Sequence, residues 1–239
     1  MIVRRHTVAV FGNSVSTVPV KEDPTVVPYP DLLRAWLLPL SWDVVSHVVD
    51  GGTIVQIEAI ARRVIATDAP QVVILQAGIV DCALRPLSPQ ERAWLSTLRP
   101  SFLRAVAIRF LHHFRDEIIR MRGVIQFTPL PEYLGSFARI LEACHQYHCR
   151  VGVLPIFPVS QSIARRNLLL PQEIETYNRG MQTCAPRPHY FHVTDFFDPR
   201  NIDDLMVNPE SVHFNQVGHQ LLAERLFTWI NPRLENIQC

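Results

Sequence analysis

Five short runs of apolar, β-branched residues, separated by longer segments with helical periodicity, constrain the fold of this 239-residue chain more than any other feature. The runs are almost continuously hydrophobic, as parallel strands are when helices cover both faces of their sheet. We predict strands at residues 7–11, 43–49, 71–77, 150–157 and 190–194. Apolar residues three and four positions apart predict helices at residues 29–38, 53–66, 131–147, 171–181 and 216–229. This alternation predicts an α/β fold, a three-layer α/β/α sandwich around a parallel sheet of about five strands.

Residues 84–128 interrupt the alternation between the third strand and the helix that leads to the fourth. Ser88 and Glu91 form a capping box around Pro89, which predicts the start of a helix. A second helix is predicted over residues 101–121. We expect this helical insertion to cover the ligand-binding edge of the sheet, as a lid would.

The insertion is rich in arginine, including Arg104, Arg109 and Arg115. These side chains form either a solvated helix face or a lid that contacts an anionic substrate. The insertion also carries aromatic residues that pack in a core or line an acyl pocket, namely Trp94, Phe102, Phe110, Phe114 and Phe127.

Composition is that of a folded globular protein: 48% of the residues are apolar, and 23 basic residues nearly balance 22 acidic ones. The net charge of +1 gives no overall electrostatic reason to expect a nucleic acid partner. Five cysteines without ligand spacing indicate no disulfide framework, and no stretch has the length of a membrane span. Since no secretory segment or linker is recognised either, we predict one domain over residues 1–239, in the cytoplasm.

Residues that can carry out chemistry follow the first strand and precede the last helix. In Gly12-Asn13-Ser14, glycine permits a tight turn, and a helix start offers backbone N–H groups to negative charge. Glu210 and His213 are three residues apart in a polar turn, so the carboxylate can orient the imidazole ring. Ligands of open α/β sheets bind at the carboxyl ends of the strands, where we expect these segments to meet. The pattern predicts a serine hydrolase.

Together these segments resemble the SGNH, or GDSL-type, hydrolase superfamily, most specifically over residues 210–219. The resemblance spans nearly the whole chain and implies a flavodoxin-like sheet and an acyl-enzyme mechanism without metal or cofactor. It implies that Ser14 is the nucleophile, that His213 is the base and that Glu210 is the acid. The implied substrate is an acyl ester of a small molecule or an acylated carbohydrate.

The resemblance also places the oxyanion donors. Gly51 or Gly52, after the second strand, matches the glycine of the second motif, and Gly78 begins the third. Asn13 stands where the family usually has aspartate, an exchange that keeps the hydrogen-bonding shape. Val80 is the serious departure, because it replaces the asparagine whose amide donates to the oxyanion.

Loss of one oxyanion donor typically costs about 2.7 to 4 kcal/mol of transition-state stabilisation. Asn13, Gln76 or an arginine of the insertion could replace it. An acyltransferase with the same triad, or a degenerate protein that only binds a ligand, is also compatible with Val80.

Other assignments are weaker. Asp203 and Asp204 are alternative acids for the triad, whereas Asp81 is expected to have a structural hydrogen-bonding role. No phosphate-binding glycine loop follows any strand, which argues against a nucleotide binder. The histidines lack the further ligands that a zinc site needs. The sequence does not determine the oligomeric state.

Overall fold

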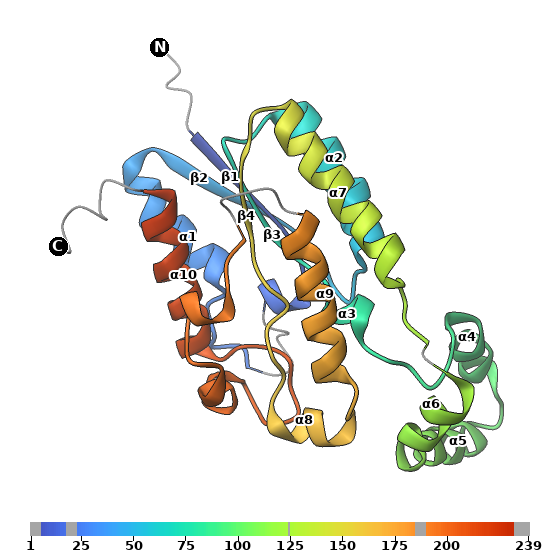
Figure 1. Cartoon of the computed structure of the whole chain (residues 1–239). Helices are drawn as coiled ribbons and strands as arrows, with labels where there is room; N and C mark the ends of the chain where they lie inside the picture. The colour runs from blue at the N-terminus through green and yellow to red at the C-terminus, as the bar shows by residue number, and fades with distance from the viewer. Residues whose placement is uncertain (1–5, 18–22, 124, 185–189, 232–239) are drawn as a thin grey trace.

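The computed structural model describes residues 6–17, 23–123, 125–184 and 190–231 (Figure 1). Four parallel strands form one sheet in the order β2-β1-β3-β4. Their bounds are β1 (His6–Asn13), β2 (Trp42–Val49), β3 (Val72–Gln76) and β4 (Arg150–Val153). The predicted α/β sandwich with a parallel sheet is therefore confirmed.

Alternate residues of the strands pack on opposite faces of the sheet. In β1, Val8 and Val10 belong to one buried cluster, and Ala9 and Phe11 belong to the other. The helices α2 (Ile54–Asp68), α7 (Leu130–Gln146) and α9 (Leu170–Cys184) cover the face of Ala9 and Phe11. The helices α1 (Tyr29–Leu37) and α10 (Gln216–Ile230) cover the other face (Figure 1). Both faces of the central strands β1 and β3 are thus largely removed from water, which explains their continuous apolar runs, whereas the edge strand β2 is partly exposed and carries Ser46 and His47.

The sheet has one strand fewer than predicted. Residues 190–194 form a single parallel bridge from Tyr190 to Val153. The side chain of Asp195 then accepts a hydrogen bond from the His192 N–H at 2.7 Å, and the chain turns into the 3₁₀ helix η3 (Val193–Asp195). This local side-chain bond replaces the ladder that a fifth strand would need.

Strand β4 also ends earlier than its apolar run. Pro155 follows closely and has no N–H to donate to a ladder. The side-chain amide of Asn178 bonds both backbone groups of Ile156, at 2.8 and 2.9 Å. Leu154 N still donates to Leu75 O of β3 at 2.9 Å, whereas Ile156 is held by α9 rather than by a neighbouring strand.

The insertion forms a lobe of three helices, α4 (Pro89–Thr97), α5 (Ser101–His113) and α6 (Arg115–Arg122). The capping box is present, because Ser88 N donates to Glu91 at 2.8 Å and Glu91 N donates to Ser88 Oγ at 3.3 Å. The helix predicted over residues 101–121 is broken at Phe114, whose backbone leaves the helical region. Figure 1 shows the lobe beside the α/β body, whereas a lid was expected across the carboxyl ends of the strands.

No helix in these described ranges has both the length and the apolar character that crossing a membrane requires. Four cysteines, Cys82, Cys144, Cys149 and Cys184, are free thiols, and Cys239 lies outside the described residues.

Candidate active site

Ser14 lies at the carboxyl end of β1, where it begins the 3₁₀ helix η1 (Ser14–Ser16). The Asn13 side chain caps this turn by accepting a hydrogen bond from Val15 N at 3.2 Å. A Cβ atom at Gly12 would lie 2.2 Å from Ser16 Oγ, so the turn requires glycine there. Ser14 is half-buried, whereas Asn13 is buried. The predicted nucleophile thus sits on a tight strand-to-helix turn.

Two buried side-chain amides lie at this corner of the sheet. Ser16 Oγ donates to Gln76 Oε1 at 2.6 Å, which fixes the amide of Gln76 at the end of β3. Within the described residues, Asn13 Nδ2 and Gln76 Nε2 are buried without a hydrogen-bond partner. Both residues line a cavity of about 20 Å³, which we call the Asn13 cavity. Its volume is about that of one water molecule, and the two amide nitrogens offer it hydrogen-bond donors.

The two predicted oxyanion glycines end the strands on either side of β1. Gly51 has φ of +61°, and Gly52 N donates to Val49 O at 2.9 Å, which closes a tight turn after β2. Gly78 has φ of +124°, and a Cβ there would lie 2.3 Å from Ile156 Cδ1. Each position therefore needs glycine for its backbone conformation or its close packing.

Asp81, on the short helix α3 (Ile79–Cys82), connects these two glycine turns. Its buried carboxylate accepts hydrogen bonds from Ile54 N at 3.0 and 3.3 Å, two residues after Gly52. Burial raises the pKa of Asp81 to about 6, although hydrogen bonds from Thr128 and Ile54 oppose the shift. Asp81 has the structural hydrogen-bonding role expected from the sequence.

His213 is buried in the loop that leads to α10. Its Nδ1 lies 3.1 Å from the hydroxyl of Ser211, and its backbone N donates to the same oxygen at 2.9 Å. Val212, between them, lines the Asn13 cavity. The loop of His213 and the turn of Ser14 thus meet at one cavity.

The carboxylate of Glu210 is exposed and forms a salt bridge with Arg166 of α8 (Gln161–Arg166). This hydrogen bond lowers the pKa of Glu210. Among the described residues, the salt-bridge partner of Glu210 is Arg166, and the hydroxyl of Ser211 contacts the ring of His213. The alternative acid Asp203 caps α8 by accepting from Gln161 N at 2.9 Å.

No protein-family model matches the sequence, and no curated protein matches it either. Solved structures do match. The acetyl xylan esterase AlAXEase has a TM-score of 0.61 at 14% identity, covering 94% of this chain and 99% of that one. A lipase/acylhydrolase from Enterococcus faecalis has a TM-score of 0.60 at 16% identity, covering 95% of this chain and 96% of that one. A GDSL-like lipase from Bacteroides thetaiotaomicron has a TM-score of 0.56 at 13% identity, covering 95% of this chain and 88% of that one. The chain therefore shares the fold of these esterases and lipases.

Within this fold, sequence reasoning missed two residues next to the predicted base. Ser211 carries no motif beyond its position two residues before His213. His219, at the start of α10, accepts a hydrogen bond from Tyr29 N at 3.2 Å on its Nδ1. Burial, and then the charge of His213, lower the pKa of His219 to about 4, so this ring stays neutral. The sequence around His219 could not indicate this contact, because its partner Tyr29 lies 190 residues away in the chain.

The described part of the chain contains no cluster of histidine, cysteine and carboxylate side chains that could hold a metal ion. Val80 is half-buried on α3, directly before Asp81. Its side chain cannot donate a hydrogen bond to an oxyanion. The buried amides of Asn13 and Gln76 are the side-chain donors that the structure places at the Asn13 cavity.

Proposed function

We propose that this protein is a serine hydrolase of the SGNH type that cleaves an acyl ester of a small molecule or carbohydrate. The observation that carries the proposal is the Asn13 cavity, which brings together the turn of Ser14, the end of β3 and the loop of His213. The GDSL-hydrolase fold, shared with named esterases and lipases, supports it. The chemical class of substrate rests on the acetyl xylan esterase among these structures.

In the proposed reaction, His213 Nε2 takes the proton of Ser14 while the hydroxyl attacks the ester carbonyl. For Nε2 to accept that proton, Nδ1 must carry hydrogen, and Ser211 Oγ lies 3.1 Å away as its acceptor. The alcohol leaves with the proton from the imidazolium. Water activated by His213 then releases the acid and restores Ser14.

Glu210 is the proposed acid of the triad. It lies three residues before His213, and its carboxylate is held at the surface by Arg166. To stabilise the imidazolium directly, Glu210 has to exchange Arg166 for Nδ1 of the ring. In the structure, the hydroxyl of Ser211 contacts Nδ1 of His213 and so orients the ring. We propose that Glu210 takes over this contact when the imidazolium forms.

The oxyanion is proposed to be held by backbone N–H groups of Ser14 and Gly52 and by the turn at Gly78. Asn13 and Gln76 contribute buried amide donors at the same end of the sheet. Such donors, fixed before the reaction, stabilise developing charge strongly because they need no reorganisation. They replace the amide that Val80 lacks.

Labelling with a fluorophosphonate probe, followed by intact mass measurement, tests the nucleophile without knowledge of the true ester. Wild type should gain one phosphonyl group, and Ser14→Ala and His213→Ala should not. Ser101→Ala is the matched control, because Ser101 is exposed at the start of α5 and should label as wild type does. Circular dichroism confirms that each variant is folded.

Failure of folded wild type to react would overturn the hydrolase proposal and favour the ligand-binding alternative. If wild type labels, release of acetate from acetylated xylo-oligosaccharides and from p-nitrophenyl acetate compares carbohydrate esters with simple ones. Transfer of the acyl group to an added sugar, rather than to water, would identify an acyltransferase.

A further inference from the structure

The insertion lobe concentrates positive charge in a nearly neutral protein. Residues 85–122 contain eight arginines and three acidic residues, whereas the whole chain has a net charge of +1. The lobe also concentrates exposed apolar surface. It holds eight of the sixteen large apolar side chains that are exposed in the described chain, and Trp94 and Val106 are each 63% exposed. Such a concentration indicates a binding surface.

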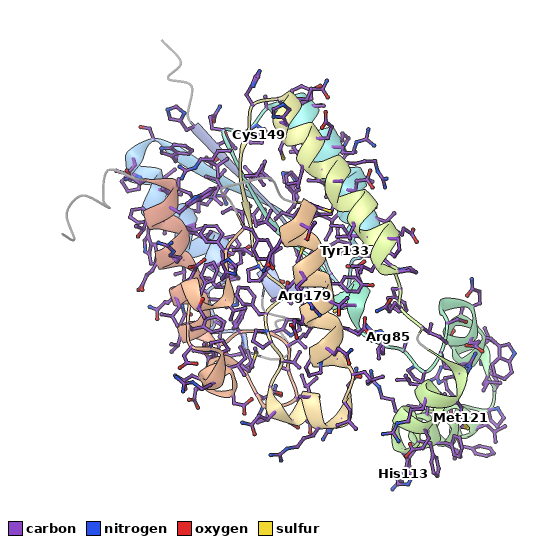
Figure 2. All side chains as sticks on the ribbon, in the orientation of Figure 1. Arg85, His113, Met121, Tyr133, Cys149 and Arg179 are labelled. Atoms are coloured by element: carbon purple, nitrogen blue, oxygen red, sulfur yellow. The ribbon has the colours of Figure 1, made fainter. Side chains whose placement is uncertain are left out.

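A cavity of about 380 Å³ opens between α4, α5 and the segment before them. Arg85, Arg104 and Arg115 line it, and no acidic residue is among its described lining side chains, so we call it the arginine cavity. Figure 2 shows Arg85 where the chain passes from the α/β body to the lobe.

Existing contacts hold two of these guanidinium groups in place. Arg85 stacks over the ring of Phe127, 4.8 Å from its centroid. Arg115 Nη2 donates to Leu84 O at 2.8 Å. Arg104 is exposed, with a long hydrogen bond of 3.4 Å to Ser96 O. Guanidinium groups held in this way suit a carboxylate or phosphate, because they bind these planar or tetrahedral anions through paired N–H donors.

An apolar groove of about 530 Å³ runs along the adjoining face of α5. Leu103, Val106 and Phe110 of α5 face Trp94 of α4 across it. Among the described side chains that line the groove, the charged one is Glu91, which is already paired with Arg122 at 2.6 Å.

The arginine cavity and the apolar groove are neighbours, because Leu87, Leu95 and Leu111 line both. We propose that the lobe binds one single-chain anionic amphiphile, with its carboxylate or phosphate headgroup in the arginine cavity and its hydrocarbon chain in the apolar groove. Charge complementarity selects this occupant, since an anion on an alkyl chain matches both hollows and a neutral lipid matches only the groove. The site is separate from the proposed hydrolase site, because no residue lines both the Asn13 cavity and either hollow of the lobe.

Titration calorimetry with decanoate, dodecanoate and dodecyl phosphate, each below its micellar concentration, tests the site. Affinity should rise about fourfold for each added methylene group until the groove is filled, the factor expected for burying one methylene. Decanol, which lacks the charge, should bind at least about tenfold more weakly than decanoate, as the loss of a charged hydrogen bond predicts.

Two pairs of variants locate the headgroup and the chain. Arg104→Gln should lose at least about tenfold in affinity, whereas Arg109→Gln, an exposed arginine of α5 outside both hollows, should change it less than about twofold. Val106→Asp should abolish binding, and the exposed neighbour Ala105→Asp should not. All four should keep fluorophosphonate labelling, which separates this proposal from the hydrolase proposal.

Equal loss in Arg104→Gln and Arg109→Gln would overturn the proposed headgroup site, because it would indicate attraction by net charge alone. Equal binding of decanol and decanoate would also overturn it. Sedimentation with anionic vesicles, without binding of any monomeric amphiphile, would identify the lobe as a bilayer-binding surface instead. Dimerisation of the free protein that is blocked by Val106→Asp, again without amphiphile binding, would assign the groove to a second copy.

Discussion

Replacing Asp81 by asparagine should change how the stability of the protein depends on pH. Asp81 is fully buried, and both oxygens of its carboxylate accept a hydrogen bond from Ile54 N. This interaction links the Gly52 turn to α3, the helix that follows Gly78. Asparagine has nearly the same shape and keeps one acceptor oxygen, but it cannot ionise. Asp81→Asn therefore removes the titration while retaining the link between the two turns.

The expected magnitude follows from the pKa of Asp81, which burial raises from 3.8 to about 6. Between these values the folded state binds more protons than the unfolded state, so the free energy of unfolding falls as pH rises. Two pKa units correspond to roughly 3 kcal/mol. This contribution is complete below about pH 4 and is lost as pH rises through 6, because ionised Asp81 must then be buried.

Urea denaturation of wild type and Asp81→Asn at several pH values between 4 and 8 measures this effect. The variant should gain stability relative to wild type as pH rises, by roughly 3 kcal/mol between pH 4 and pH 7.5. Glu117→Gln, at an exposed position on α6, reports the effect of removing one surface carboxylate. A difference between Asp81→Asn and wild type that stays constant with pH, or that falls as pH rises, would refute the reasoning.

Four further substitutions test the proposed site. If Glu210 is the acid of the triad, Glu210→Gln should lower kcat by about a hundredfold or more. Ser211→Ala, which removes one hydrogen bond to His213, should lower kcat about tenfold. A larger loss of kcat in Ser211→Ala than in Glu210→Gln, measured by steady-state kinetics, would assign the orienting role to Ser211. Val80→Asn should leave kcat on p-nitrophenyl acetate within about twofold of wild type, because Asn13 and Gln76 already supply amide donors at this corner of the sheet. A rise of about tenfold or more would show instead that the oxyanion lacks a donor there. Gly78→Ala should destabilise the fold by about 1 to 3 kcal/mol in urea unfolding, because its φ is +124° and Ile156 occupies the space of a Cβ; an unchanged midpoint would contradict that strain.

Local patterns in the sequence were enough for most of the architecture. The apolar runs predicted all four strands: β3 is buried along its whole length, and the edge strand β2 remains mostly apolar although it carries Asp43, Ser46 and His47. The five main helices followed from the spacing of their apolar residues, and the first insertion helix followed from Ser88 and Glu91, whose capping contacts span only three residues. Val80 could likewise be recognised as a departure, since a missing amide is visible without coordinates.

The tertiary structure decided the features that depend on residues far apart in the chain. The apolar run at residues 190–194 predicted a strand, yet its pairing with the distant strand β4 stops after one bridge, from Tyr190 to Val153. The carboxylate of Glu210 lies against Arg166, 44 residues away, which its spacing from His213 could not predict. The sequence left the arginines of the insertion as either a solvated face or an anion-contacting lid, and folding places Arg85, Arg104 and Arg115 around one cavity. The periodicity of a sequence indicates which face of a helix is buried. It does not indicate which charged side chains from different segments lie close together, because that depends on how α4, α5 and α6 pack against one another.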